Sequence, residues 1–223
     1  SKANKELFDL ATKFNIPVVT TLMGRGAFPD GHELCLEMPG MHGNYTATTS
    51  IQKSDLLVAI GVRFDDRVTA NPSFFAQNAK VIHADIDPAE IGKVREAQVP
   101  IVGDAKSVIL GLIDALQDEE LDTKNWINEL NSMKTEHPLS YNQDENGPLK
   151  VPFVLEELQD LTEEGAIVVS GVGQHQMWIS QHWNFTEPNT WLNSGGLGTM
   201  GYSLPAAIGA KTAYPEKLVL ALD

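Results

Sequence analysis

A charged segment directly follows a strongly apolar stretch near the middle of the chain. The stretch 55–61 is typical of a buried β-strand, and it ends on glycine. Ligands of open α/β sheets bind beyond the carboxyl ends of the strands, where this segment would lie. Arginine can bind phosphate through two parallel hydrogen bonds, and aspartate can accept hydrogen bonds from ribose. A surface cluster of salt bridges is the alternative. The segment consists of Gly61, Val62, Arg63, Phe64, Asp65, Asp66 and Arg67.

Acidic residues also end the next two predicted strands. Asp85 and Ile86 close the stretch 80–86, and Asp104 follows the stretch 99–102. Because parallel strands place their carboxyl ends at one edge of a sheet, these groups favour one extended cofactor lying across that edge. None of these segments has the Gly-x-Gly-x-x-Gly fingerprint, so a standard NAD site is a weak interpretation.

Two glycine-rich loops precede predicted helices in the last third of the chain. Free amides at a helix N-terminus form an anion site, and two such loops suit a diphosphate group. Taken alone, His175 is more often structural than catalytic, and Met200 is more often a core residue. Their shared setting favours a functional role for both. The loops contain Gly171, Val172, Gly173, Gln174, His175 and Gln176, and then Gly195, Gly196, Leu197, Gly198, Thr199, Met200 and Gly201.

The segment Pro39 to Gly43 has two glycines around a methionine and a histidine, Gly40, Met41, His42 and Gly43. Glycine permits close approach of the backbone to a ligand, although a mobile surface loop is the simpler explanation. Cys35 is the one cysteine, so no internal disulfide forms. A small apolar residue in a loop or core is a better interpretation of Cys35 than a nucleophile.

Alternating strands and helices would position these loops. This order predicts an α/β fold in which parallel sheets are covered by helices on both faces. The polar stretch 118–150 predicts a surface helix followed by a linker. Strands are expected at 17–21, 55–61, 80–86, 99–102, 166–170 and 218–222, and helices at 3–14, 45–53, 105–116, 123–135, 152–161, 174–181 and 203–213.

The composition excludes several classes of partner. A formal net charge of −14 argues against binding to nucleic acid or to an anionic membrane, because both need a basic face. No apolar run approaches the roughly 20 residues of a membrane span. The N-terminus has no hydrophobic signal core, and a single cysteine suits a reducing compartment. A cytoplasmic location is therefore expected.

Taken together, the motifs resemble those of the large catalytic subunits of the acetohydroxyacid synthase (acetolactate synthase) family. The resemblance runs the length of the chain. The last motif is shared more loosely across thiamine-diphosphate enzymes, whereas the third and fifth are more specific. The motifs are TTLMGRGAFP (20–29), PGMHG (39–43), GVRFDDRV (61–68), HADIDPAEIGK (83–93), SGVGQHQMW (170–178) and SGGLGTMGYSLPAAIGA (194–210).

The resemblance implies two α/β domains with different cofactors. A parallel-sheet central FAD-binding domain, transhydrogenase-like and lacking its first strand, would span 1–135. A linker would span 136–150, and the N-terminal part of a thiamine-diphosphate-binding domain would span 151–223. The family's residues for FAD correspond to Gly40, Met41, His42, Gly61, Val62, Arg63, Phe64, Asp65, Asp85, Ile86, Asp104 and Ala105. Those for thiamine diphosphate correspond to Val172, Gly173, Gln174, His175, Gly198 and Met200, and those near the substrate channel to Asp66 and Arg67.

The activity implied is the decarboxylating condensation of two 2-ketoacids, pyruvate with pyruvate or 2-ketobutyrate, in branched-chain amino-acid biosynthesis. Thiamine diphosphate, Mg²⁺ and a non-redox FAD are the implied cofactors. A homodimer or larger assembly and a regulatory subunit are the implied partners. A glyoxylate-carboligase-type enzyme and a non-catalytic nucleotide-binding module remain alternatives. The chain is expected to be an internal fragment, inactive alone, with the catalytic glutamate in an absent domain and the metal ligands just after Asp223.

Overall fold

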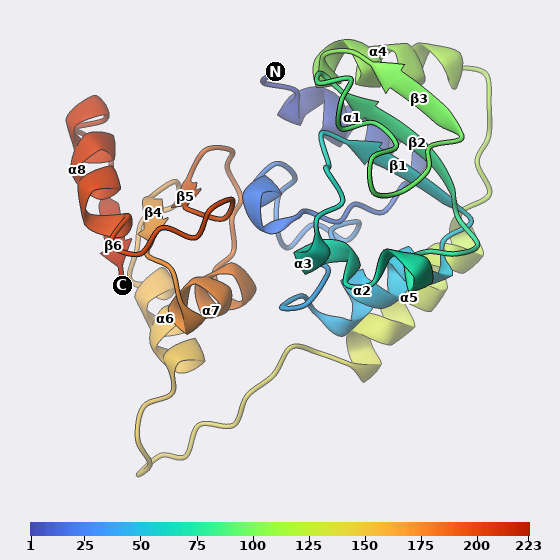
Figure 1. The fold of residues 1–223 in the computed structure, drawn as a ribbon. Helices are drawn as coiled ribbons and strands as arrows, with labels where there is room; N and C mark the ends of the chain where they lie inside the picture. The colour runs from blue at the N-terminus through green and yellow to red at the C-terminus, as the bar shows by residue number, and fades with distance from the viewer.

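The computed structural model describes residues 1–223 and contains two α/β units joined by an extended segment (Figure 1). The first unit contains α1 (Asn4–Phe14), η1 (Leu22–Gly24), α2 (Tyr45–Lys53), β1 (Leu56–Ile60), α3 (Asp66–Thr69), η2 (Pro72–Phe74), β2 (Lys80–Asp85), β3 (Val99–Val102), α4 (Ala105–Ala115) and α5 (Lys124–Glu136). The second contains α6 (Val151–Asp160), β4 (Ile167–Ser170), α7 (Gln174–His182), β5 (Trp191–Asn193), α8 (Ser203–Ala213) and β6 (Val219–Leu222).

The sheet of the first unit is parallel, in the order β1-β2-β3. Side chains alternate between its faces, so neighbouring residues of β1 serve different cores. Ala59 packs in a cluster with Ile51 of α2. Ile60 packs instead against the cluster that Leu10 of α1 and Ile109 of α4 form. Helices therefore cover both faces, as the sequence predicts.

The sheet of the second unit is also parallel, in the order β5-β4-β6. Its central strand β4 is buried at every residue. Val168 contributes to a core with Leu155 of α6 and Ile179 of α7. Val169 faces the other way, into a cluster with Ala207 of α8. The α/β class with parallel sheets is thus confirmed for both units.

The polar region between the units contains a helix that is only partly a surface helix. In α5, Leu130 and Met133 are buried against Ala47 of α2, while the opposite face is exposed. Residues 137–150 then form an extended segment that leads to the second unit (Figure 1). No helix is both long and apolar enough to cross a membrane.

The strand predicted at 17–21 is wrong. The segment makes one isolated parallel bridge, between Val18 and Cys35, and no strand. Pro17 has no amide hydrogen to donate, and the chain turns into η1 from Leu22. The short elements α3, η2 and β5 were not predicted. Three to four residues carry too little periodicity to be recognised.

The single thiol is buried in this bridged region. Cys35 is 3% exposed, and its Sγ lies 3.5 Å from Asp30 Oδ1. Burial raises the pKa of Cys35 to about 12, and the nearby carboxylate adds to the rise. The preference for a packed residue over a nucleophile therefore agrees with the structure.

The Cys35 thiol is expected to resist alkylation in the folded protein. Near pH 8 its thiolate fraction should be on the order of 1,000-fold below that of an ordinary cysteine, and burial blocks access as well. Iodoacetamide labelling, followed by mass spectrometry with and without denaturant, measures this. Equal labelling rates in the two conditions would contradict the buried position.

Candidate functional site

A cavity of about 490 Å³ lies where the two units meet. The loops that follow β1, β4 and β5 all line it, so the carboxyl ends of both sheets point to one space. This is the position that ligands occupy in open α/β sheets. Its lining includes Thr21, Leu22, Met23, Met38, Pro39, His42, Gly61, Val62, Arg63, Phe64, Asp65, Asp66, Arg67, Val68, Val172, Gln176, Met177, Ser194, Gly195, Gly196, Leu197 and Gly198.

The loop after β1 is held in shape by a buried aromatic anchor. Phe64 is 4% exposed although its φ is +52°, and its ring packs edge-on against Phe75 and His83. His83 is fully buried and its Nε2 lies 2.8 Å from Val62 O. Because a carbonyl only accepts, Nε2 carries the proton. These contacts fix the backbone at the cavity wall, while the side chains of the neighbouring charged residues are not buried with the Phe64 ring.

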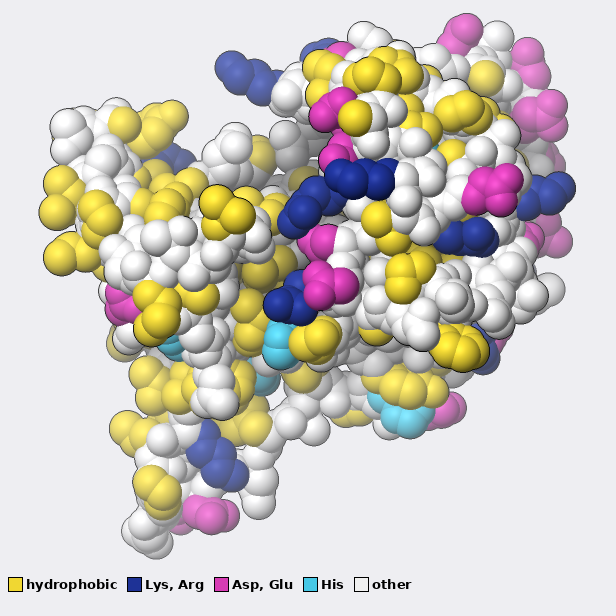
Figure 2. Space-filling model, in the orientation of Figure 1, with side chains coloured by type: hydrophobic (Ala, Val, Ile, Leu, Met, Phe, Trp, Pro, Cys, Tyr) yellow, Lys and Arg dark blue, Asp and Glu magenta, His cyan; other side chains and the backbone are white.

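The charged side chains of this loop pair with one another but remain accessible. Arg63 lies 3.0 Å from Asp65, and Arg67 lies 2.9 Å from Asp66. Both arginine side chains are more than half exposed. Figure 2 shows blue and magenta side chains gathered along the boundary between the two lobes. The surface salt bridges that the sequence offered as an alternative are therefore present. Such exposed pairs are weak, so the guanidinium groups remain able to bind an anion.

Asp65 has a structural role that the sequence did not indicate. Its side chain accepts hydrogen bonds from the amides of Arg67 and Val68, so it is the N-cap of α3. Its second oxygen accepts from Arg63. The cap therefore fixes the position of the Arg67 backbone at the start of α3.

The glycines of the segment 39–43 permit close approach to the protein's own backbone. A Cβ on Gly40, whose φ is +96°, would lie 2.3 Å from Arg67 O. The next amide, of Met41, donates to the same oxygen at 2.8 Å. Gly43 lies as tightly against Met38 O. The sequence suggested that these glycines allow a ligand to approach the backbone. In the structure the backbone of Arg67 occupies the space beside Gly40, so this loop supports the loop after β1.

The loop 39–43 also touches the second unit. His42 lines the cavity, and its carbonyl accepts a hydrogen bond of 2.7 Å from Gln181 Nε2 of α7. Met41 is 58% exposed and lies outside the cavity. Residues predicted for the two cofactors thus line the same cavity: His42 from the FAD set, and Val172 and Gly198 from the thiamine-diphosphate set.

The glycine-rich loops of the second unit leave backbone groups free for an anion. Helix α7 has Gly173 at its N-cap and no capping side chain, so its first amides lack intrahelical partners. His175 Nε2 is buried without a hydrogen-bond partner, 3.6 Å from Asp223 Oδ1. Gly196 has no atom within 4 Å of an added Cβ, and the nearest to Gly198 is 3.7 Å away. These features leave room for a phosphate-bearing group.

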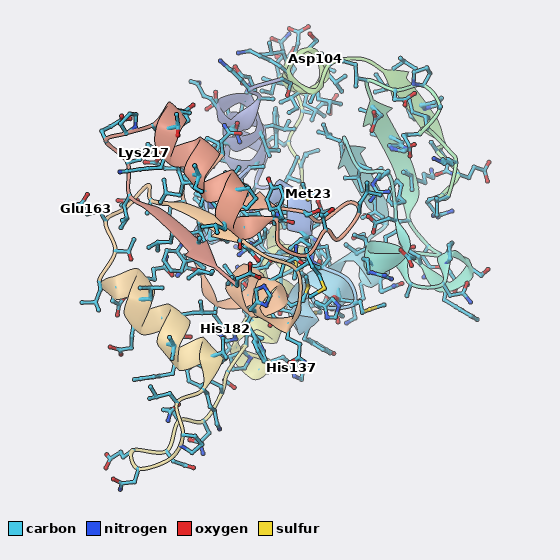
Figure 3. All side chains as sticks on the ribbon, turned by 60° about the vertical axis from the view of Figure 1, so that its left-hand side comes forward. Met23, Asp104, His137, Glu163, His182 and Lys217 are labelled. Atoms are coloured by element: carbon cyan, nitrogen blue, oxygen red, sulfur yellow. The ribbon has the colours of Figure 1, made fainter.

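Several predicted residues lie at the sheet edge but outside the cavity. Asp85 accepts from the amide of Asp87, and Asp104 caps α4 by accepting from Lys106 N. Figure 3 shows Asp104 well away from Met23, which lines the cavity. Outside the cavity lining stand Gly40, Met41, Asp85, Ile86, Asp104, Ala105, Gly173, Gln174, His175 and Met200.

Sequence reasoning missed one wall of the cavity. Thr21, Leu22 and Met23 line it because the indole of Trp191 donates to Leu22 O at 3.0 Å. Met23 Sδ would lie 2.5 Å from a Cβ on Gly195, so the two segments are in close contact. The available signal was the motif TTLMGRGAFP (20–29), which carries the resemblance but was given no role in a site. The sequence prediction that the chain lacks a Gly-x-Gly-x-x-Gly fingerprint is also wrong, because Gly196, Gly198 and Gly201 have this spacing, between β5 and α8.

Comparison with known proteins agrees with this division into two units. Residues 1–112 match the model of the central domain of thiamine pyrophosphate enzymes. Residues 171–223 match that of the C-terminal thiamine-pyrophosphate-binding domain of the same enzymes.

Relatives match along the whole chain. Acetolactate synthase of Mycobacterium leprae (strain TN) is 53% identical over 100% of the chain and 36% of its own length. The acetolactate synthase large subunit of Corynebacterium glutamicum is 50% identical over 99% of the chain. Acetolactate synthase 1 of Nicotiana tabacum, a chloroplastic protein, is 44% identical over 100%. The chain spans 36% of the length of the first two. The chain therefore belongs to the thiamine pyrophosphate enzymes and is similar throughout to their acetolactate synthases.

Proposed function

We propose that the whole protein is an acetolactate synthase and that the cavity between the units is its cofactor site. The observation that carries the proposal is the meeting of the loops after β1, β4 and β5 in one space. The similarity to acetolactate synthases over the whole chain supports pyruvate and other small 2-ketoacids as substrates. A carboligase for another ketoacid or a non-catalytic nucleotide-binding module has no comparable support.

The second unit fits thiamine diphosphate. The uncapped N-terminus of α7 and the open space beside Gly196 and Gly198 suit a diphosphate group. His175, in the first turn of α7, has a buried Nε2 without a hydrogen-bond partner. When bound, thiamine diphosphate supplies the electron sink that decarboxylation of a 2-ketoacid needs. The contribution of Val172, Gly173, Gln174, His175, Gly198 and Met200 would be to hold and orient it.

We propose that the first unit binds FAD. Gly61 has a φ of +65° and open space around an added Cβ, so a ligand can approach its backbone. Arg63 has an exposed guanidinium group at this wall and can bind a phosphate. Gly40, Met41, His42, Val62, Phe64 and Asp65 would complete the central part of the site. Asp85, Ile86, Asp104 and Ala105 would extend it along the sheet edge.

Magnesium has no residues assigned to it. No group of three or more His, Cys, Asp or Glu side chains in residues 1–223 is arranged to hold a metal ion. Asp66 and Arg67 line the cavity, and we propose that they face the path of the substrate. The proposal also includes a homodimer or larger assembly, a regulatory subunit and a cytoplasmic location.

Acetolactate formation tests the proposal. The whole protein, supplied with pyruvate, thiamine diphosphate, Mg²⁺ and FAD, is expected to produce acetolactate, measured as acetoin after acid decarboxylation. Pyruvate should be preferred over glyoxylate in a direct competition. Absence of product with all three cofactors present would reject the proposal.

Filling the cavity should block the reaction. Gly196→Leu adds a side chain at a cavity-lining position where an added Cβ has no atom within 4 Å, so the Cβ fits without a clash and the rest of the side chain takes space from a cofactor. We expect activity to fall by roughly 10- to 100-fold through misplacement of the reacting groups. Gly111→Leu on the exposed face of α4 is the control. Equal activity of the two variants would place the reaction elsewhere.

A further inference from the structure

One ion pair is buried at the junction of the two units. Arg25 Nη1 donates to Asp30 Oδ1 at 2.7 Å, and the two side chains are 1% and 0% exposed. The guanidinium group also lies 5.7 Å from the ring centroid of Phe185, in the second unit. Every other ion pair in residues 1–223 has at least one partner with 45% or more of its side chain exposed, the lowest such value being that of Lys106 with Glu6. A fully buried pair is expensive to desolvate, so its position calls for an explanation.

Asp30 makes two hydrogen bonds to the backbone of the second unit. Its Oδ2 accepts from the Phe185 amide at 2.7 Å, and its own amide donates to Phe185 O at 3.1 Å. Phe185 is 1% exposed and packs in the core of the second unit, 5.1 Å from the ring of Trp191. The carboxylate of one unit is thus fixed to the core of the other.

The same segment forms the cavity wall. Shortly before Arg25, the three residues Thr21, Leu22 and Met23 line the cavity, and Leu22 O accepts from the Trp191 indole. Met23 then lies against Gly195. Movement of residue 30 away from Phe185 would therefore move this wall away from the glycine loop after β5.

We propose that Asp30 is a positioning residue, an interdomain clamp that holds the loops of the two units in register around the cavity. Arg25 neutralises the buried carboxylate, and the Phe185 backbone is what the clamp holds. The consequence for cofactor binding rests on the proposed function, whereas the clamp itself is a statement about the geometry of the two units.

Two double variants separate the clamp from the buried charges. Arg25→Met/Asp30→Asn removes both charges and keeps a carbonyl oxygen that can accept from the Phe185 amide. Arg25→Met/Asp30→Leu removes both charges and the acceptor. Spin labels on Asn78→Cys and Glu216→Cys, exposed positions in the two units, report their separation by pulsed electron resonance. Cys35 is buried and stays unlabelled.

The asparagine variant is expected to keep the narrow distance distribution of the parent protein, and the leucine variant to broaden it at least twofold. Circular dichroism confirms that each variant is folded, and Arg25→Met/Asp30→Ala replaces the leucine variant if that one is not. A narrow distribution without the acceptor, or a broad one with asparagine, would overturn the proposal. The distances are measured without cofactor, so they test the clamp alone. If the proposed function is wrong, the distance distributions will still behave as expected, but the parent protein will bind neither thiamine diphosphate nor FAD.

Discussion

Gly40→Ala is expected to lower the free energy of unfolding by roughly 2–5 kcal/mol and to abolish cofactor binding at the loop after β1. The added methyl group would meet Arg67 O at 2.3 Å and Val68 Cα at 2.9 Å, both of them backbone atoms. Neither can rotate away as a flexible side chain would. The segment 65–68 must shift, and with it the Asp65 cap and Arg67. Denaturant unfolding measures the stability, and FAD titration measures the binding.

Gly31→Ala is the matched control for this substitution. Gly31 has a similar φ of +81° but no atom within 4 Å of an added Cβ. Its substitution should cost only the strain of the left-handed backbone, about 1–2 kcal/mol, and leave binding unchanged. If the two variants unfold at the same denaturant concentration, the close contact between Gly40 and Arg67 does not exist in the protein.

Arg25→Met is expected to cost about 3–5 kcal/mol of unfolding free energy, because it leaves the Asp30 carboxylate buried without its cation. Adding Asp30→Asn should recover much of this loss, since no buried charge then remains. Lys53→Met, which breaks the exposed pair with Glu129, should leave the free energy of unfolding nearly unchanged. A loss for Arg25→Met as small as that of Lys53→Met would show that Asp30 is not buried as described.

The pH dependence of the Arg25→Met variant has a definite sign. Burial raises the pKa of Asp30, and the Arg25 guanidinium and the Phe185 amide oppose the rise. Removing Arg25 raises it further, while the unfolded chain keeps the ordinary value. The cost of the substitution should therefore grow as the pH rises above the ordinary aspartate range and shrink as the pH falls toward it. Unfolding curves across that range measure the difference from the parent protein.

Local signals were sufficient for much of the fold. The apolar stretch before Gly61 and the one before Asp85 are long enough to identify as strands, and Asn44, Asp104 and Gly173 mark where α2, α4 and α7 begin. The strand Trp191–Asn193 has three residues, too few for any pattern. The stretch from Pro17 had strand-like residues, but pairing with residues 34–37 left only one bridge.

The candidate site was predictable where it consists of loops after strands, and not where distant segments meet. Arg63 and Val172 follow recognisable strands, so their place at the cavity could be expected. Met23 and Met38 reach the cavity where the units pack together: Leu22 O, next to Met23, accepts from the Trp191 indole, and Met38 Sδ lies 3.1 Å from Ser180 Oγ. Such contacts depend on the tertiary arrangement, and no spacing within one segment encodes them.

Hydrogen exchange, measured by mass spectrometry on the whole protein with saturating FAD, thiamine diphosphate and Mg²⁺, tests the central claim most directly. Exchange should slow in peptides that cover 61–67, 172–177 and 194–198, because each of these peptides contains residues that line the cavity between the units. A second cavity, of about 750 Å³, is lined by residues such as Glu163 and His182 and serves as an internal comparison. Unchanged exchange in the peptides that cover 61–67, 172–177 and 194–198, or slowing confined to the second cavity, would contradict the assignment of the cofactor site.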